Sequence, residues 1–461
     1  MIAETSIPGL LVVDLALHGD KRGWFKENWQ RAKMTAAGLP DLGPVQNNIA
    51  FNGTVGATRG IHAEPWDKYV SVATGRIFGA WVDLRQGPTF GTVFTTEIDP
   101  SRAVFVPRGV GNAYQTLEPD TAYVYLVNDH WSPESSYTFL NLADETVAIP
   151  WPIPLHDAEL SDRDKAHPRL ADVTPVPPKK TLILGADGQL GRALRTEYGE
   201  QPHIEYATRA DLDITATDLD TARRWQDYEV IINAAAYTAV DTAESAQGRA
   251  AAWSVNANAV SRLAAIAERH RITLVHVSSD YVFDGASERP YLETDPLTPL
   301  GVYGQSKAAG DLAAATATRH YIVRTSWVIG DGPNFVRTMA SLAARGVDPR
   351  VIDDQSGRLT FAEDIAAGIR HLLDTHAPYG TYNLTGAGEV RTWAQIAGEI
   401  FRLTGHAPGR VMPVRAADYH ADAEEPVAPR PKNSVLDLTK IQSTGFSPRD
   451  ATSSLATYLA R

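Results

Sequence analysis

One stretch decides the fold of the longer part of this chain: Thr181-Leu182-Ile183-Leu184-Gly185-Ala186-Asp187-Gly188-Gln189-Leu190-Gly191. Its first four residues form an apolar run of the length expected for a buried strand. The glycines then follow in a G-x-x-G-x-x-G pattern that opens a predicted helix at Gln189–Tyr198. The first two glycines permit a tight turn and close approach of the backbone to a pyrophosphate, and the third lets the helix pack near the strand. The stretch predicts a dinucleotide-binding unit; an ordinary glycine-rich turn is the alternative.

The alternation of strand and helix continues after this stretch. Further runs that predict strands are His203–Ala207, Glu229–Asn233, Thr273–Val277 and Tyr321–Arg324, and a long helical pattern covers Ala250–His270. Such alternation is typical of a doubly wound parallel sheet. The C-terminal residues carry mixed elements, which we expect to cover the carboxyl edge of the sheet, where substrates bind in such folds.

The N-terminal part, residues 1 to about 150, has a different pattern. Gly, Pro, Asn and Asp separate short runs that are rich in β-branched and aromatic residues, namely Leu10–Val13, Tyr69–Val72, Ile77–Val82 and Ala122–Val127. Helical periodicity is confined to about Trp29–Ala37. The pattern predicts an all-β sandwich or barrel.

Proline marks the boundary between the two patterns. The segment Thr174-Pro175-Val176-Pro177-Pro178-Lys179 predicts a stiff, extended linker. We therefore expect a first domain at residues 1–173, a linker at 174–179 and a second domain at 180–461. A chain of 461 residues is also too long for one ordinary hydrophobic core, which fits this division.

The composition excludes several classes of function. Because the chain has no cysteine, disulfides, thiolate catalysis and cysteine-bound zinc are ruled out, and the 13 histidines show no H-x-x-x-H spacing, so we expect no metal. A net charge of -12 argues against broad nucleic-acid binding. Residues 1–5 lack the basic start of a signal peptide, and no run of about 18 apolar residues could span a membrane, so we expect a cytoplasmic protein.

Three polar side chains in the second half indicate the chemistry of ketone reduction. Ser279 ends a predicted strand, and Tyr303 and Lys307 are four residues apart, so on a helix they share one face. A fixed ammonium near a phenol favours the phenolate and brings the tyrosine into range as an acid or base. Ser279 can hydrogen-bond the same substrate oxygen. A lone Y-x-x-x-K also fits a surface tyrosine and a solvated lysine, but the nucleotide loop upstream favours the catalytic interpretation.

The end of the second predicted strand bears on the choice of cofactor. It reads Ala207-Thr208-Arg209, without the acid that would bind the ribose 2′-hydroxyl of NAD. Arg209 suits the 2′-phosphate of NADP, so we expect NADPH; NADH stays open, and a solvated arginine is the alternative. Small residues after the third strand would let a cofactor lie against the backbone. The candidate cofactor-binding residues are Gly185, Asp187, Gly188, Gln189, Leu190, Arg209, Asp213, Ile214, Ala235, Ala236, Tyr237, Tyr303 and Lys307.

Motifs along the whole second half point to one family. They are Gly185–Gly191, Asn233–Asp241, Ser278–Gly285, Tyr303 with Lys307, Arg324–Trp327, Asn334-Phe335, Asp353–Gln355 and Arg430–Ser434. In this order and spacing, residues 180–461 resemble dTDP-4-dehydrorhamnose reductase, an extended short-chain dehydrogenase with a Rossmann fold. The resemblance implies that Tyr303 is the proton donor, that Lys307 tunes it, and that Ser279 replaces the usual Thr. It also implies a sugar pocket lined by Val240, Tyr281 and Trp327.

Two features of this half depart from the reductase pattern. Arg358 stands where the family usually has Pro, which puts the nearby loop in doubt but not the chemistry. Some relatives pair through a magnesium-bridged interface of acidic residues, and those acids have no match here.

The N-terminal half offers scattered candidates, namely Arg22, Arg59, His62, Lys68 and Asp164, which spacing alone cannot bring together. The pieces that carry a resemblance are Arg22–Glu27, Gln46–Asn48, Arg59–His62, Lys68, Val82–Arg85, Val106–Gly109 and Leu160–Asp164. They resemble dTDP-4-dehydrorhamnose 3,5-epimerase, a cupin-like jelly roll that is usually dimeric.

The resemblance to the epimerase implies roles for these residues. His62, balanced by Asp164, would remove a proton beside a ketone, and Lys68 would stabilise the enolate oxygen. The residues that it implies for binding the nucleotide diphosphate are Arg22, Phe25, Glu27, Gln46, Asn48 and Arg59.

Two positions depart from the epimerase pattern. The Tyr that returns a proton should precede Ser132-Pro133, but Trp131 stands there, and an indole N–H is not a usable acid. His130, Tyr114 or Tyr137 could substitute. The A-H-G-F segment of the family is replaced by residues 111–114, GNAY, so a second His is lost. Single epimerisation, slow double epimerisation and an inactive site all stay open.

Together these patterns predict a bifunctional enzyme. A jelly roll would epimerise dTDP-4-keto-6-deoxyglucose at carbons 3 and 5, and a Rossmann domain would reduce the 4-ketone with NADPH to dTDP-L-rhamnose. Tethering would hold the second site near the first at up to roughly mM effective concentration. The alternatives are a reductase whose first domain only binds nucleotide sugars or dimerises, and a non-catalytic dinucleotide sensor. We expect a homodimer through the first domain.

Overall fold

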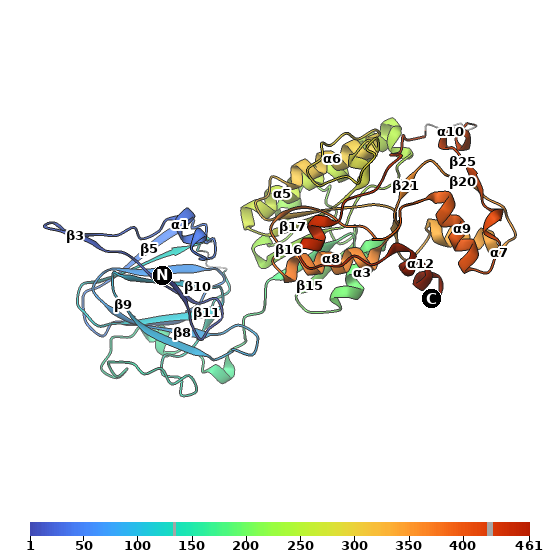
Figure 1. Cartoon of the computed structure of the whole chain (residues 1–461). Coiled ribbons are helices and arrows are strands. Elements are labelled where there is room, and N and C mark those ends of the chain that lie inside the picture. Colours follow the sequence, from blue (N-terminus) through green and yellow to red (C-terminus); the bar gives the residue numbers. More distant parts are fainter. Residues whose placement is uncertain (132–134, 422–426) are drawn as a thin grey trace. The chain divides into compact units, whose positions relative to one another are not determined.

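The computed structural model describes residues 1–131, 135–421 and 427–461. The chain divides into two compact units, Met1–Pro178 and Lys179–Arg461 (Figure 1). The division falls inside the predicted proline-rich linker, and each unit has hydrophobic cores of its own. Within the described ranges, no helix is long and apolar enough to cross a membrane.

Two antiparallel sheets form the first unit. The first has the strand order β1 (Ile2–Glu4), β2 (Leu11–Asp14), β10 (Arg102–Val106), β7 (Lys68–Thr74), β12 (Thr121–Val127) and β5 (Gln46–Asn52). The second has the order β13 (Thr138–Phe139), β6 (Thr58–Ala63), β11 (Val110–Thr116), β8 (Ile77–Asp83) and β9 (Val93–Ile98). The helices are α1 (Arg31–Ala36), α2 (Asp162–Lys165) and the short 3₁₀ helix η1 (Leu170–Asp172). The predicted runs correspond to β2, β7, β8 and β12, and the predicted helix at 29–37 corresponds to α1.

Both faces of the second sheet are covered by other parts of the first unit, so its strands hold their side chains in fixed positions. On the inner face, Trp81 packs with Val72 of the first sheet. On the outer face, Ala80 packs with Leu140 and Leu142 from the segment after β13. All seven residues of β8 are therefore buried. Strand β6, two strands from β8 in this sheet, has a half-buried His62 in an otherwise largely buried strand.

A hairpin of β3 (His18–Asp20) and β4 (Gly23–Phe25) projects from the body of the first unit (Figure 1). All six residues of its strands are exposed. Gly23 adopts a φ of 131°, which favours glycine in this tight turn. The backbone N–H of Arg22 donates to the Asp20 carboxylate at 2.8 Å, so the turn is ordered by local contacts.

Six parallel strands form the sheet of the second unit, in the order β15 (Ile204–Ala207), β14 (Lys180–Leu184), β16 (Tyr228–Asn233), β17 (Thr273–Ser279), β18 (His320–Thr325) and β23 (Gly380–Asn383). The first five match the predicted strands, and β23 was not predicted. Side chains of β14 alternate between two cores: Leu182 and Leu184 lie in one, with residues of α5 (Ala259–His270), and Ile183 lies in the other, with residues of α8 (Ala362–Asp374). Helices therefore cover both faces of the sheet.

The long helix predicted at 250–270 contains a local irregularity. It consists of α4 (Ala246–Trp253), a π-helical turn η5 (Ser254–Asn258), and α5. π-turns are frequent at functional sites. Here the turn carries Asn256, whose side chain bonds both the backbone N–H and the carbonyl of Tyr237 at 2.9 and 3.0 Å. The turn thereby fixes the loop that follows β16.

The remaining helices include α3 (Gln189–Tyr198) and α6 (Val302–Ala314) beside the sheet, and a C-terminal part with its own core. That core holds residues of α7 (Phe335–Ala344), α9 (Trp393–Leu403) and α12 (Ala451–Leu459). Three short strand pairs also belong to the second unit: β19 (Val328–Ile329) with β22 (Thr360–Phe361), β20 (Arg350–Ile352) with β25 (Met412–Val414), and β21 (Ser356–Gly357) with β24 (Arg391–Thr392). The short helices are α10 (Ala416–Tyr419), α11 (Thr439–Ser443), η2 (Leu219–Thr221), η3 (Trp225–Asp227), η4 (Thr242–Glu244), η6 (Asp280–Val282) and η7 (Pro408–Arg410).

Candidate functional sites

A cavity of about 260 Å³ opens at the carboxyl ends of β14 and β16, where the strand order changes direction. Such a switch point is where open α/β sheets bind their ligands. Of the predicted cofactor residues, those that line it are Gly185, Asp187, Gly188, Arg209, Asp213, Ile214, Ala235, Ala236 and Tyr237. Four predicted residues lie outside the described lining, namely Gln189, Leu190, Tyr303 and Lys307; Leu190 packs against a core and Gln189 lies beside Gly330.

Two glycines of this stretch, Gly185 and Gly191, leave no room for a side chain. Gly185 has a φ of 74°, and a Cβ there would lie 2.8 Å from the backbone nitrogen of Ala235. A Cβ on Gly191 would lie 2.1 Å from the carbonyl oxygen of Gly185. The loop therefore packs tightly on both the next strand's loop and its own helix, as a pyrophosphate-binding turn requires.

Arg209 and Asp213 interact with each other at the rim of this cavity. Arg209 Nε donates to Asp213 Oδ2 at 3.2 Å, and the Arg209 side chain is 82% exposed. Asp213 also accepts hydrogen bonds from Thr215, which hold its pKa below the usual range. An exposed guanidinium beside the cavity can contact a 2′-phosphate without being buried.

Ser279, Tyr303 and Lys307 come together where β17 ends beside α6. The Ser279 hydroxyl donates to Asp280 Oδ1 at 3.0 Å and accepts from the backbone N–H of Tyr281 at 3.2 Å. The Tyr303 ring meets the Tyr281 ring edge-on, with centroids 5.3 Å apart. Lys307 is buried and donates to the Val277 carbonyl at 2.6 Å. The two helix residues thus face the end of β17; their spacing predicted only that they share one face of a helix.

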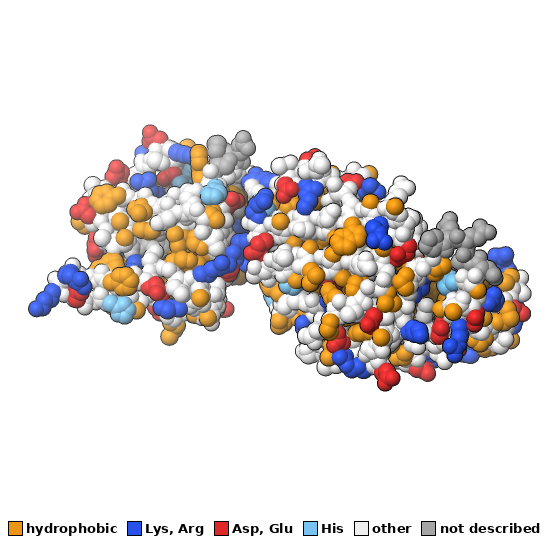
Figure 2. Space-filling view, turned by 90° about the horizontal axis from the view of Figure 1, so that it is seen from above, with side chains coloured by type: hydrophobic (Ala, Val, Ile, Leu, Met, Phe, Trp, Pro, Cys, Tyr) orange, Lys and Arg blue, Asp and Glu red, His pale blue; other side chains and the backbone are white. Residues whose placement is uncertain are grey.

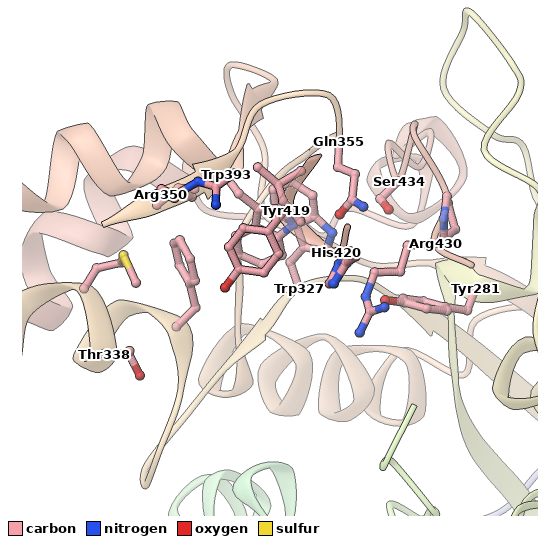
Figure 3. A pocket seen from close by; sticks show the side chains of 15 residues that line it. Tyr281, Trp327, Thr338, Arg350, Gln355, Trp393, Tyr419, His420, Arg430 and Ser434 are labelled. Atoms are coloured by element: carbon pink, nitrogen blue, oxygen red, sulfur yellow. The ribbon is translucent and has the colours of Figure 1, made fainter. Parts of the chain in front are cut away.

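A second cavity of the same unit, of about 400 Å³, lies next to Tyr281 (Figure 3). Its lining includes Tyr281 and Trp327, two of the three residues predicted for a sugar pocket, while Val240 is half-buried and is not among its described lining residues. Trp327 adopts a φ of 47° and stacks on Trp393 with centroids 3.8 Å apart. Arg430 lies beside Tyr281 (Figure 3). The cavity offers aromatic faces and a guanidinium, which suit a nucleotide diphosphate attached to a sugar.

Arg358, which replaces the usual Pro, has a clear structural role. It is half-buried, and its guanidinium donates to the carbonyls of Gly388 at 3.1 Å and Leu436 at 3.4 Å. Burial lowers the pKa of Arg358 from its usual value. The arginine therefore connects its loop to two other segments of the second unit.

In the first unit, His62 and Asp164 meet although they are 102 residues apart in the sequence. His62 Nε2 lies 3.0 Å from Asp164 Oδ1, and both residues line a cavity of about 520 Å³. Ser161 caps the short helix α2 by accepting the backbone N–H of Asp164 at 3.1 Å. Burial would raise the pKa of Asp164, but the hydrogen bond from His62 holds it below the usual range. A carboxylate is therefore kept charged beside the imidazole.

Lys68 is buried on β7 beside Glu64 and Tyr125. Its Nζ lies 2.6 Å from Glu64 Oε1 and 5.0 Å from the centroid of the Tyr125 ring. Burial lowers the pKa of Lys68 to about 7, whereas the nearby carboxylate favours the charged form. Neither Glu64 nor Tyr125 was identified from the sequence. The E-x-x-x-K spacing was the only local signal for the ion pair.

The six predicted nucleotide-binding residues of the first unit fall into two groups. Arg59 lines the His62 cavity and donates to Asn52 Oδ1 at 3.1 Å. Gln46 donates to Asn48 Oδ1 at 2.8 Å on β5. Of the six, Arg59 alone is among the described lining residues of that cavity; those that are not are Gln46 and Asn48 on β5, and Arg22, Phe25 and Glu27 on and after the projecting hairpin. Within this group, Glu27 pairs with Lys33 at 2.9 Å.

The candidates for returning a proton differ in their surroundings. Trp131 is 61% exposed, and its backbone N–H donates to Gln46 Oε1 at 3.3 Å; Ser132-Pro133 lie outside the described residues. The Tyr114 hydroxyl bonds Asn52, and His130 lies near the surface of the described chain. Tyr137 stacks on Phe139, and the edge of Phe139 meets His62 at 5.5 Å. Tyr137 thus lies one ring away from His62.

Family comparisons match both units. A model of the RmlD substrate binding domain matches residues 179–461, and a model of dTDP-4-dehydrorhamnose 3,5-epimerase matches residues 4–172. A protein from Streptococcus pyogenes serotype M6 described as an RmlC homologue is 51% identical over 38% of this chain and 90% of its own length. The chain belongs to both families. Its first unit is an epimerase-family domain, and its second is a reductase-family domain.

Relatives of the reductase-family domain include the dTDP-4-dehydrorhamnose reductase of Aggregatibacter actinomycetemcomitans, 39% identical over 59% of this chain and 95% of that protein. A crystal structure of dTDP-4-dehydrorhamnose reductase from Bacillus anthracis in complex with NADP covers 62% of this chain and 100% of its own, at 30% identity and a TM-score of 0.55. The glycine loop too tight for a Cβ and the adjoining cavity fit such a dinucleotide.

The electrostatics of the reductase-family domain differ from the prediction. Burial and the Asp280 carboxylate raise the pKa of Tyr303, in part opposed by the Ser279 hydroxyl. Lys307 was expected to lower it. Burial also lowers the pKa of Lys307 to about 8 and raises that of Asp280 to about 6. Tyr303 is therefore held as a phenol, which suits a group that donates a proton.

Lys307 is followed on α6 by a buried ion pair. Asp311, one turn further along α6, accepts from Arg324 Nε at 2.9 Å, and both side chains are nearly inaccessible to solvent. Arg324 also donates to the Glu293 carbonyl at 3.0 Å. The Asp311 carboxylate opposes the fall in the pKa of Lys307. His276 Nε2 lies 3.9 Å from Asp311 Oδ1, too far for a hydrogen bond, and burial and Lys307 hold the pKa of His276 well below its usual value.

Proposed function

We propose that this chain makes dTDP-L-rhamnose in two steps. The epimerase-family domain inverts carbons 3 and 5 of dTDP-4-keto-6-deoxyglucose, and the reductase-family domain reduces the 4-ketone with NADPH. The observation that carries the proposal is the presence, on one chain, of the His62–Asp164 pair and of the Ser279, Tyr303 and Lys307 group.

The two folds are part of the proposal. The paired antiparallel sheets of residues 1–173 are consistent with a cupin-like jelly roll. The parallel sheet of residues 180–461 is consistent with a Rossmann fold of the extended short-chain dehydrogenase type. Residues 174–179 act as the linker.

In the first step, a neutral imidazole removes a proton beside the ketone. Asp164 accepts the hydrogen bond of His62 Nε2 and balances the imidazolium that forms. Negative charge develops on the ketone oxygen, and we assign its stabilisation to the buried Lys68 ammonium. Lys68 is not among the described lining residues of the His62 cavity, whereas Arg59 and Arg163 are. Returning a proton to the other face of the ring inverts the carbon. Tyr137, stacked one ring away from His62, is the best candidate for this donor.

In the second step, NADPH supplies a hydride to carbon 4 when it is bound. The Tyr303 hydroxyl gives its proton to the oxygen, and the Ser279 hydroxyl orients that oxygen. Lys307, anchored at the Val277 carbonyl, places positive charge beneath the site as the phenol loses its proton. Trp327 and Arg430 would hold the nucleotide part of the substrate.

The deciding experiment supplies the purified chain with dTDP-4-keto-6-deoxyglucose and NADPH and identifies the sugar product. We expect NADPH oxidation and dTDP-L-rhamnose. His62→Ala should slow formation of this product by about 10²–10⁴-fold, because the base is lost, yet should still reduce ketone that a separate epimerase has inverted. Unchanged product formation by His62→Ala would refute an active first domain.

A second candidate function rests on Trp131, whose exposed indole stands in place of the expected phenol. In that case, the first domain only binds nucleotide sugars or mediates dimerisation, and the chain is a reductase alone. Rhamnose formation that begins only after a separate epimerase is added would favour this candidate.

The pH dependence of the two steps should differ. Burial lowers the pKa of Lys68 to about 7 and that of Lys307 to about 8. Above each value the ammonium loses its proton, so epimerisation should fall as the pH rises through about 7, and reduction only near 8. Solvent deuterium uptake by the ketone measures the first step, and NADPH oxidation with pre-epimerised ketone measures the second. Lys68→Met should abolish the fall of the epimerisation rate near pH 7. If the rate of this variant still falls there, another group causes that pH dependence.

We further propose that the chain forms a homodimer through the first domain. Strand β5 lies at the edge of its sheet, and Ile49 and Phe51 on it are 68% and 63% exposed; Phe25 on the hairpin is 67% exposed. Binding of a second copy of the chain at this edge would remove these apolar side chains from water. It would also bring Arg22, Phe25 and Glu27, which do not reach the described lining of their own His62 cavity, to the site of the other copy.

Ile49→Asp should therefore weaken the dimer by more than about tenfold, because a charge would be buried in an apolar contact. Sedimentation of the full chain measures the change. Val390→Asp, at a 41% exposed position of the second unit, is the matched control and should leave the association constant unchanged. Equal effects of both substitutions would contradict the assignment of this edge.

A further inference from the structure

A third side chain lies next to the His62–Asp164 pair. His167 Nε2 is 3.8 Å from Asp164 Oδ1, the same oxygen that lies 3.0 Å from His62 Nε2. One ligand atom from each of the three residues lies within 4.8 Å of the other two. Among the residues that the structure describes, this is the one group of three or more such side chains.

The rest of the site does not account for His167. It is 9% exposed, and its Nε2 has no hydrogen-bond partner among the described residues. The ring is held by packing: it stacks on Phe139 with centroids 4.7 Å apart and meets the His62 ring edge-on at 5.3 Å. A buried nitrogen without a partner is costly, so a ligand for it is expected. That nitrogen points toward the shared carboxylate oxygen.

Two imidazole nitrogens and one carboxylate oxygen are a donor set typical of Zn²⁺. Zinc bonds of about 2.0–2.2 Å in a tetrahedron place ligand atoms roughly 3.3–3.5 Å apart. The observed separations of 3.0 and 3.8 Å lie on either side of this range. The two imidazole nitrogens also lie within 4.8 Å of each other, so the side chains would close around the ion as it binds.

We propose that His62, Asp164 and His167 form a binding site for a divalent transition-metal ion such as Zn²⁺, and that the bound ion switches off proton removal by His62. An imidazole with a metal on Nε2 carries its proton on Nδ1, so it has no lone pair left to accept another. The nearby Arg163, which lies over Phe139 at 5.1 Å, opposes a cation and should keep binding reversible. The inhibition rests on the proposed epimerisation; the binding does not.

The binding test uses the full chain after treatment with a chelator. Calorimetric titration with Zn²⁺, and the visible absorption of tetrahedral Co²⁺, should each report one ion per chain. His167→Leu should weaken this binding by more than about tenfold, because even the loss of a residue that only supports a metal ligand costs that much. His167→Gln keeps a polar side chain of similar size and tests whether a folding defect causes the loss. His156→Leu removes an exposed histidine 3.3 Å from Asp157 and is the matched control. Equal affinity of His167→Leu and the unmodified chain would overturn the site.

The inhibition test measures solvent deuterium uptake by the ketone with and without Zn²⁺. We expect loss of uptake with Zn²⁺, recovery with chelator, and unchanged NADPH oxidation with pre-epimerised ketone. Zn²⁺ bound through His167 with uptake unaffected would overturn the switch. A chain that shows no uptake even with chelator, yet binds one ion through His167, would refute the proposed epimerisation and support the metal site.

Discussion

Replacing Tyr303 with Phe should slow reduction of the pre-epimerised ketone by about 10²–10⁴-fold while NADPH binding and epimerisation stay unchanged. The substitution removes one hydroxyl and keeps the ring, so the edge-on contact with Tyr281 at 5.3 Å is preserved. Burial and Asp280 raise the pKa of Tyr303, so at neutral pH the wild-type group is a protonated phenol next to Ser279. Without that proton, the oxygen that becomes an alkoxide when carbon 4 receives the hydride has to be protonated by water.

Three measurements on the full chain separate the outcomes for Tyr303→Phe. NADPH oxidation gives the reduction rate, fluorescence titration gives cofactor affinity, and solvent deuterium uptake gives epimerisation. Tyr281→Phe is the matched control because it removes a neighbouring hydroxyl from the cavity of about 400 Å³, and it should change kcat far less. A silent Tyr303→Phe would remove this residue from the mechanism and favour a non-catalytic dinucleotide sensor.

Local patterns predicted the second domain well because its signals are contiguous. The strand and loop at 181–191 appear as β14 and the start of α3, and the loop residues line the cavity at the switch point. The spacing of Tyr303 and Lys307 placed both on one helix face. Burial, however, has no local signature. The sequence therefore suggested that Lys307 lowers the pKa of Tyr303, whereas desolvation raises it.

In the first domain, local sequence patterns could not predict which residues meet. His62 and Asp164 come from β6 and α2, and only the sheet packing brings them together. Resemblance predicted that pair, but it missed Glu64, Arg163 and His167. His167 follows Asp164 by three residues, so a D-x-x-H pattern was available, but its meaning depended on His62 being next to it. Val240 was assigned to the sugar cavity by resemblance and is not among its described lining residues.

The largest stability effect should come from Asp311→Leu. Asp311 and Arg324 are both nearly inaccessible to solvent and pair at 2.9 Å, and the Lys307 ammonium is also buried in this region. Removing the carboxylate leaves two buried cations without compensation, which typically costs about 3–5 kcal/mol. Hydrogen exchange of peptides from β17 and β18 during urea unfolding reports this loss for the second unit alone. Asp374→Leu breaks the exposed pair with Arg370, 3.3 Å apart, and should cost less than about 1 kcal/mol.

A double substitution tests whether the unpaired charge is the cause. Adding Arg324→Leu to Asp311→Leu removes one of the stranded cations and should restore part of the lost stability, although each change alone is destabilising. Asp311→Asn keeps a hydrogen-bond acceptor for Arg324 and should cost less. Because Asp311 opposes the fall in the pKa of Lys307, Asp311→Asn should also move the upper limb of the reduction profile from about pH 8 to lower pH. If the pH at which reduction falls is unchanged in Asp311→Asn, Asp311 stabilises the fold without acting on Lys307. A double variant less stable than both single variants would show that lost packing, rather than unpaired charge, causes the destabilisation.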